Sequence, residues 1–126
     1  MSPAFAARRP VVLIVEDEFL IRLQAAQIIS RAEFDVVEAS SADEAISILE
    51  ARSDIAVLFT DIQMPGRMDG LKLAAAVKGR WPPIKIVATS GLVNVRQEDL
   101  PEGGRFISKP YDSIQLTAAL QELTAS

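Results

Sequence analysis

The chain has 126 residues, the size of one domain, and 49% of them are hydrophobic, which is enough for a full core. Its formal net charge of −4, with Lys and Arg scattered singly or in pairs, argues against direct binding of nucleic acid, because phosphate backbones require clustered basic side chains. Cys and His are absent from the sequence, which excludes disulfides, thiolate zinc sites and catalytic imidazoles, so any metal must bind to oxygen ligands.

The beginning of the chain resembles neither a membrane anchor nor a signal peptide. No apolar run approaches the roughly 20 residues that span a bilayer, so we expect no membrane partner and a cytoplasmic protein. Arg8 and Arg9 are not followed by the long apolar stretch of a signal peptide. We expect residues 1–10 to form a flexible tail and residues 11–126 to form one domain.

Short apolar runs alternate with amphipathic segments along the chain. Runs rich in β-branched residues are typical of strands buried on both faces, and they predict strands at residues 11–15, 34–37, 55–59, 84–88 and 106–107. Apolar positions with a helical period predict helices over about residues 19–31, 41–49, 71–78 and 113–123. Ser41 with Glu44 predicts a capping box, Gly79 predicts the end of the third helix, and Asp112 predicts the cap of the last one.

The segment between Gly91 and Gly104 departs from this alternation of strands and helices. A helix is expected there, but Pro101 and Gly103 crowd its end and its apolar face is weak. We therefore predict a short or irregular helix within residues 93–100.

Alternation of strands and helices about five times predicts an α/β fold with a doubly wound parallel sheet. With five strands, the expected arrangement is flavodoxin-like, with strand order 2-1-3-4-5 and helices on both faces. In such sheets the functional site lies at the carboxyl ends of the strands, near the switch point between strands 1 and 3.

Polar residues follow four of the predicted strands and would meet at that edge. They are Glu16 and Asp17 after the first strand, Asp61 after the third, Thr89 after the fourth and Lys109 beside the fifth. Carboxylates so close together repel one another unless a cation intervenes, and Mg²⁺ suits such oxygen ligands. The sequence therefore predicts a magnesium site beside an ammonium group and a hydroxyl.

Each of these residue types also has an ordinary structural role. An acidic residue after a strand is a common helix cap, which is the interpretation we favour for Glu18. A strand-end Thr often bonds to the backbone, and a Lys usually faces solvent. The functional interpretation is favoured because four strands contribute to one point.

Four short motifs together resemble the response-regulator receiver domain, and the resemblance covers residues 11–123. They are Val15–Glu18, Asp61–Gly70, Thr89–Gly91 and Lys109–Pro110. The Asp-x-x-Met-Pro segment combined with the distal Lys-Pro pair makes the resemblance specific. It implies that residues 11–126 form a receiver domain.

The resemblance also implies a role for each matching residue. Asp61 would be the phosphoacceptor. The Mg²⁺ ligands would be Glu16, Asp17, Asp61 and the backbone carbonyl of Gln63. A Glu at position 16 departs from the Asp that is common in the family.

The remaining implied roles concern the switch. Thr89 would hydrogen-bond the phosphoryl group, Lys109 would pair with it, and Phe106 would move when the switch operates. Pro110 would follow a cis peptide bond.

The resemblance implies a single-domain response regulator that promotes only its own phosphoryl transfer and dephosphorylation. Its partners would be a histidine kinase or a histidine phosphotransfer protein and a downstream protein target, with a homodimer as a further possibility.

Two alternatives to this function remain. A phosphohydrolase would resemble Asp-x-Asp at the nucleophile, where this chain has Gln63. A receiver-like adaptor would bind partners without phosphorylation, an idea motivated by Glu16 and the unusual segment after Gly91.

Overall fold

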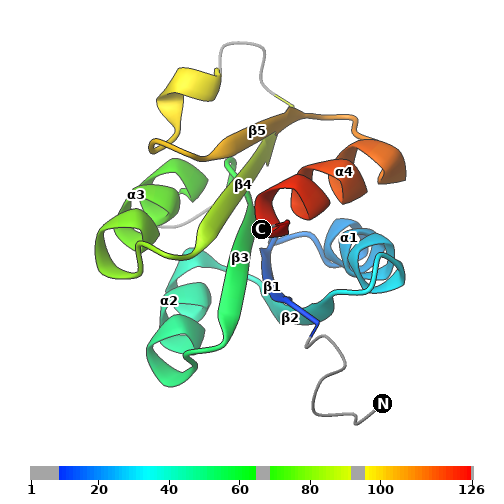
Figure 1. Ribbon diagram of the computed structural model, residues 1–126. Coiled ribbons are helices and arrows are strands. Elements are labelled where there is room, and N and C mark those ends of the chain that lie inside the picture. Colours follow the sequence, from blue (N-terminus) through cyan, green and yellow to red (C-terminus); the bar gives the residue numbers. More distant parts are fainter. Residues whose placement is uncertain (1–8, 65–68, 92–95, 126) are drawn as a thin grey trace, which may run out of the picture.

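The computed structural model describes residues 9–64, 69–91 and 96–125. Its elements, in chain order, are β1 (Val11–Val15), α1 (Phe19–Arg31), β2 (Asp35–Ala39), α2 (Ala42–Ala51), β3 (Ile55–Asp61), α3 (Gly70–Arg80), β4 (Lys85–Ser90), the 3-10 helix η2 (Gln97–Asp99), β5 (Arg105–Ser108) and α4 (Ser113–Thr124). All strand pairs are parallel, and the order β2-β1-β3-β4-β5 confirms the predicted flavodoxin-like sheet (Figure 1).

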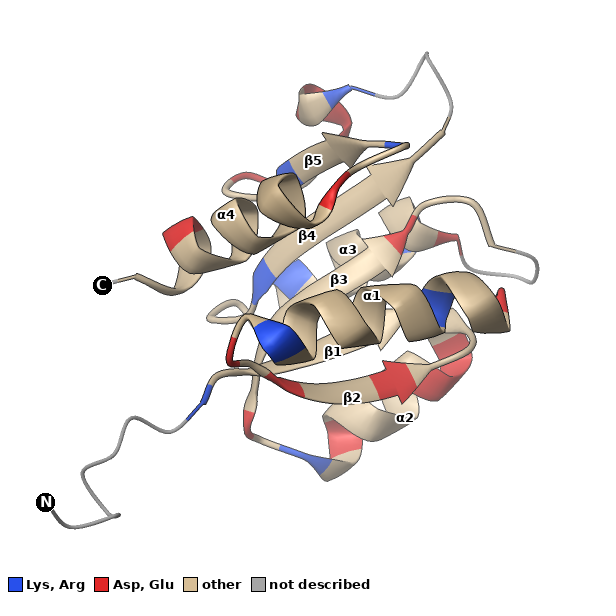
Figure 2. Cartoon of the chain, turned by 90° about the vertical axis from the view of Figure 1, so that its right-hand side faces the viewer, with Lys and Arg blue, Asp and Glu red and all other residues tan. Residues whose placement is uncertain are grey.

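Helices cover both faces of the sheet, so each face has its own apolar core. Helices α1 and α4 lie side by side on one face (Figure 2), and α2 and α3 lie on the other (Figure 1). Successive side chains of a strand point to opposite faces. In β1, Val12 and Ile14 pack under α1 and α4, whereas Leu13 and Val15 pack under α2 and α3. This double burial explains why the strands appear in the sequence as continuous apolar runs.

Strands β3 and β4 extend beyond their predicted apolar runs. The sequence predicts β3 to end at Phe59, but the strand continues through Thr60 to Asp61, and β4 continues to Ser90. The cause is backbone pairing, since Asp61 lies in register with Thr89 and ladder hydrogen bonds form whatever the side chain. Asp61 and Thr89 therefore lie within strands, not in flexible loops.

Two helix ends differ in detail from their predictions. Ser41 caps α2 by accepting a hydrogen bond from the Glu44 amide at 3.1 Å, but the Glu44 carboxylate accepts from the amide of Ser40 instead of Ser41. The capping box is thus displaced by one residue. Helix α3 continues through Gly79 and ends at Arg80, immediately before Trp81 and the two prolines that follow it.

The described part of the segment after Gly91 contains a single 3-10 turn, η2, which confirms a short or irregular helix; residues 92–95 of the predicted range lie outside the described residues. The Gln97 side chain accepts a hydrogen bond from the Phe106 amide at 2.9 Å and donates one to the Gly104 carbonyl. Its amide group therefore takes the place of a neighbouring strand beside β5, on the side away from β4.

The predicted tail lies outside the described residues up to position 8, so the division at residue 10 stays a prediction. Arg9 donates a hydrogen bond to the carbonyl of Ser30 at 2.9 Å, and the carbonyl of Pro10 accepts one from Asp35 at 3.0 Å. Within the described ranges, no helix combines the length and apolar character needed to cross a membrane.

Candidate functional site

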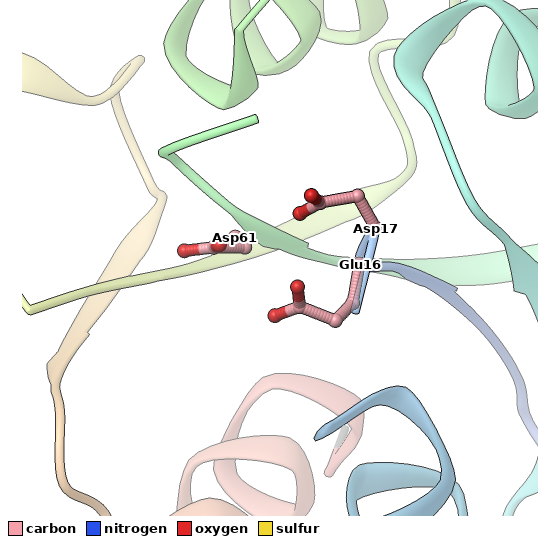
Figure 3. Close-up of side chains that lie close together, drawn as sticks. All are labelled: Glu16, Asp17 and Asp61. Carbon is pink, nitrogen blue, oxygen red and sulfur yellow. The ribbon is translucent and has the colours of Figure 1, made fainter. Parts of the chain in front are cut away.

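Three carboxylates meet at the carboxyl ends of β1 and β3, where the sequence predicts the site. Oxygens of Glu16, Asp17 and Asp61 all lie within 4.8 Å of one another. Figure 3 shows the three side chains pointing toward a common space. Glu16 and Asp61 are buried, whereas Asp17 is exposed. The cluster is thus an acidic pocket with one side open to solvent.

The turn between β1 and α1 fixes the backbone and the side chain of Glu16. The Glu16 amide donates to the carbonyl of Ala39 at 3.1 Å, which ties the end of β1 to the end of β2. The Glu16 carbonyl accepts a hydrogen bond from Nη1 of Arg22 at 2.8 Å. Its carboxylate accepts the amide of Glu18 at 3.0 Å through Oε2. Glu18 is the cap residue of α1, but its side chain makes no capping hydrogen bond.

Asp61 lies at the end of the central strand β3 and faces Lys109. The Nζ atom of Lys109 is 3.4 Å from Oδ1 of Asp61 and 3.6 Å from Oε1 of Glu16, so one ammonium group pairs with both buried acids. Apart from this ion pair, Oδ1 of Asp61 has no hydrogen-bond partner among the described residues. The peptide bond between Lys109 and Pro110 is cis, as the resemblance implies.

Thr89 lies beside Asp61, on the neighbouring strand β4. Thr89 and Asp61 are partners in the register between β4 and β3, and Thr89 is only 2% exposed. Its Oγ1 atom has no hydrogen-bond partner among the described residues, which is costly for a buried polar atom. A group that arrives at Asp61 would find this donor available.

The loop after Asp61 is anchored to β4 by side chains. Oγ of Ser90 donates a hydrogen bond to Oε1 of Gln63 at 3.2 Å. The amide of Gly70 donates to the carbonyl of Ile62 at 2.9 Å. A Cβ atom at Gly70 would lie 2.2 Å from the carbonyl oxygen of Asp61, so only glycine allows α3 to approach the acid this closely.

Burial and crowding shift the titration of the two buried acids. Burial raises the pKa of Asp61, and the charge of Asp17 raises it further, while Lys109 and the Gln63 amide oppose the shift. Burial likewise raises the pKa of Glu16, with a further contribution from Asp61; the Glu18 amide and Lys109 act in the opposite direction. Both pKa values are nevertheless raised, so Lys109 does not fully offset the cost of burying the two ionised carboxylates.

Phe106, the predicted switch aromatic, is half-buried beside the pocket. It packs on a small apolar cluster formed by Ile62, Ala88 and Leu100. Ile62 and Ala88 directly adjoin Asp61 and Thr89 in the chain, so movement at either strand end would reach the ring. Its role in switching stays a prediction.

Sequence reasoning missed two residues of this region. Arg22 contacts the backbone of Glu16, and no local pattern in the sequence indicates that contact. The ring of Tyr111 packs edge-on against Phe59, with centroids 5.9 Å apart. Burial, together with the charges of Glu16 and Asp61, raises the pKa of Tyr111 to about 12. The sequence feature that could have identified Tyr111 is its position directly after Lys109 and Pro110.

The residues present fit a divalent cation with a preference for oxygen ligands. Three carboxylates supply hard oxygen donors within a small space, and Oδ1 of Asp61 lacks a hydrogen bond among the described residues. Burial, the largest cause of the raised pKa values of Glu16 and Asp61, disfavours their ionised forms, and a bound cation would stabilise those forms.

Comparison with known proteins defines the class. Residues 12–121 match the response regulator receiver domain, and the chain belongs to that family. Among curated proteins, it is 30% identical over 116 residues to the sensor kinase CckA of Brucella abortus, and 31% identical over 118 residues to the transcriptional regulatory protein PdtaR of Mycobacterium tuberculosis. These alignments cover 89% and 87% of this chain, but only 12% and 54% of the relatives.

Solved structures agree with this assignment. A response regulator receiver protein from Sinorhizobium medicae superimposes with a TM-score of 0.85 at 26% identity, covering 92% of this chain and 94% of that one. A receiver protein from Pseudomonas putida gives a TM-score of 0.81 at 27% identity, with coverage of 93% and 99%. The chain spans about half or less of the curated relatives' length, so the activities of those whole proteins are not assigned to it.

Proposed function

We propose that this receiver domain is a phosphorylation switch in which Asp61 accepts a phosphoryl group from a phosphohistidine on a kinase or phosphotransfer protein. The environment of Asp61 carries the proposal. One of its oxygens lacks a hydrogen bond among the described residues, Lys109 lies 3.4 Å away, and the buried hydroxyl of Thr89 has no partner there either. A receiver-family chain with this arrangement is prepared to hold a new anionic group at Asp61.

The chemistry requires positioning and neutralisation of charge, not a proton-transfer base. An oxygen of the ionised Asp61 carboxylate attacks phosphorus, and a P–O bond forms as the P–N bond of the phosphohistidine breaks. The electron pair of the P–N bond leaves with the donor imidazole. Lys109 stabilises the negative charge on the phosphoryl oxygens.

The proposed Mg²⁺ ligands are Glu16, Asp17, Asp61 and the backbone carbonyl of Gln63. When bound there, Mg²⁺ would supply positive charge to the phosphoryl oxygens. The neighbouring hydrogen bond between Ser90 and Gln63 holds the Gln63 side chain on β4. We infer that this contact also limits the freedom of the Gln63 backbone.

Phosphorylation would then act on the switch residues. The Thr89 hydroxyl donates a hydrogen bond to a phosphoryl oxygen, a charge-assisted contact of about 1.5–3 kcal/mol. Its movement gives Phe106 a new position, and the face made by η2, β5 and α4 changes shape. This face would bind a downstream protein target. A full change of population requires about 5 kcal/mol, so two or three such contacts are sufficient.

The proposal extends to setting and partners. The protein would act in the cytoplasm as a signalling partner, without nucleic-acid or membrane contacts, and would catalyse only its own phosphoryl transfer and dephosphorylation. A homodimer through the switched face is compatible with this function.

Intact-mass measurement after incubation with acetyl phosphate and Mg²⁺ tests the proposal. We expect one added phosphoryl group on the wild-type chain and on the Asp54→Asn control, whose substitution removes a surface acid paired with Arg52. The Asp61→Asn variant should gain none. Failure of the wild-type chain to gain the group would favour the adaptor alternative, and steady turnover of a generic phosphate ester would favour the phosphohydrolase.

A further inference from the structure

Arg22, on the second turn of α1, joins three parts of the fold. Its Nη1 atom donates to the carbonyl of Glu16 at 2.8 Å, and its Nε atom donates to Oε1 of Glu38 on β2 at 3.1 Å. The guanidinium also lies over the ring of Phe19, 5.6 Å from its centroid. The side chain is only 15% exposed, so it is held in place and not free in solvent.

The contact with Glu16 is important because of the bond to which that carbonyl belongs. It is part of the peptide unit that joins Glu16 to Asp17, and this unit is planar. The amide on the other side of Glu16 donates to the carbonyl of Ala39 at 3.1 Å. Glu16 is therefore anchored on both sides. Arg22 fixes the plane from which the side chains of Glu16 and Asp17 depart toward Asp61.

The position of Arg22 is unfavourable for the helix itself. Arg22 is the fourth residue of α1, near the positive end of the helix dipole, where cations are disfavoured. The first turn of α1 contains no acidic residue, and the side chain of the cap residue Glu18 makes no capping hydrogen bond. The contacts that Arg22 makes outside the helix therefore account for its placement better than helix stability does.

We propose that Arg22 is a positioning residue for the cation site, and this inference rests on the proposed function. Arg22 holds the peptide between two of the three acids, so that their oxygens converge before any cation arrives. It touches a backbone carbonyl and not the clustered carboxylates, so it acts through their orientation. A Lys at this position lacks the planar fork that reaches Glu16 and Glu38 at once.

Isothermal titration of Mg²⁺ into the full chain tests this role, with urea unfolding in EDTA as a parallel measurement. The variants are Arg22→Gln, Arg22→Lys and Glu38→Gln. The Glu38→Gln variant removes the ion pair with Glu38 but keeps the Arg22 guanidinium beside Glu16. The matched control is Arg80→Gln. Arg80 makes the same two kinds of contact, an ion pair with Glu50 at 2.9 Å and a cation–π contact with Trp81 at 4.3 Å, but at the opposite end of the sheet.

We expect Arg22→Gln to weaken Mg²⁺ binding about tenfold, the usual cost of losing a group that orients a metal ligand. Arg22→Lys should weaken it nearly as much, Glu38→Gln less, and Arg80→Gln not at all. With acetyl phosphate, the Mg²⁺ concentration for half-maximal phosphorylation of the Arg22→Gln chain should rise by the same factor, while the rate at saturating Mg²⁺ stays near the wild-type rate. A purely structural role would not raise the Mg²⁺ requirement while leaving the rate at saturating Mg²⁺ unchanged.

Two different negative results are distinguishable. If wild-type chain binds Mg²⁺ but Arg22→Gln and Arg22→Lys bind it as tightly as Arg80→Gln does, the role of Arg22 is refuted and the proposed function stands. If wild-type chain does not bind Mg²⁺, the proposed function fails and the role of Arg22 fails with it.

Discussion

The acidic pocket makes the Asp61 carboxylate a source of instability in the metal-free protein. Burial of an ionised carboxylate costs several kcal/mol, and it is the largest cause of the raised pKa of Asp61; the charge of Asp17 adds to it. Lys109, 3.4 Å from Asp61, offsets about 5 kcal/mol at an effective dielectric constant of 20. Because the pKa is raised overall, the unfavourable contributions prevail, and we expect Asp61→Asn to increase the free energy of unfolding by roughly 1–3 kcal/mol at pH 7 in EDTA.

The pH dependence follows from the raised pKa of Asp61. In the range between the ordinary and the raised pKa, the folded chain binds a proton at Asp61 more readily than the unfolded chain does. Wild-type stability therefore falls as pH rises through that range. The advantage of Asp61→Asn appears in the same range, and it disappears below the ordinary pKa of Asp, where Asp61 is protonated in both states.

Urea unfolding followed by the fluorescence of Trp81 measures this difference. The control is Asp54→Asn, since Arg52 lowers the pKa of Asp54 and removing that charge should give no gain in stability. Excess Mg²⁺ should narrow or reverse the difference, because a cation bound to the folded wild-type chain adds about 2.7 kcal/mol at a hundredfold excess over its dissociation constant. Equal or lower stability of Asp61→Asn in EDTA at pH 7 would refute the reasoning, as would a gain that persists at low pH.

Three further predictions concern the surroundings of the site. Gly70→Ala should lower the free energy of unfolding, measured in urea, by roughly 1–3 kcal/mol, because its Cβ would lie 2.2 Å from the Asp61 carbonyl oxygen. The control is Gly79→Ala on the same helix, where an added Cβ meets no other atom within 4 Å. This control should raise the free energy of unfolding by about 0.5–1 kcal/mol. Gln97→Ala should accelerate hydrogen exchange of the Phe106 amide, measured by NMR, and unchanged exchange would show that Gln97 does not protect it. Lys109→Met should lower the free energy of unfolding in EDTA by roughly 1–3 kcal/mol, since two buried acids lose their partner, and a stabilised variant would contradict the pairing.

The fold and the location of the site were predictable because both follow from regular features of the sequence. Continuous apolar runs indicate strands buried on both faces, and parallel strands bring their carboxyl ends to one edge. The convergence of Glu16, Asp17, Asp61 and Lys109 at that edge is confirmed by their distances. The strand ends were placed too early because polar residues such as Asp61 interrupt an apolar run without interrupting backbone pairing.

The supporting contacts were not predictable because they depend on where separate elements meet. Arg22 reaches the Glu16 carbonyl and Glu38 only because α1 packs beside the ends of β1 and β2. Gln97 pairs with the edge of β5 only because the segment before it folds back as a 3-10 turn. Neither contact has a fixed spacing or a local motif. Sequence reasoning therefore identifies the residues that meet at the site before it identifies those that hold them in place.

Reductive trapping of the phosphorylated chain tests most directly whether Asp61 is the phosphoacceptor. Borohydride reduces an aspartyl phosphate to homoserine, and peptide mass spectrometry then locates the altered residue. After treatment with acetyl phosphate and Mg²⁺, we predict homoserine at position 61 and unaltered Asp17, Glu16 and Asp69. Homoserine at another aspartate, or none at all in a chain that has gained a phosphoryl group, would contradict the assignment.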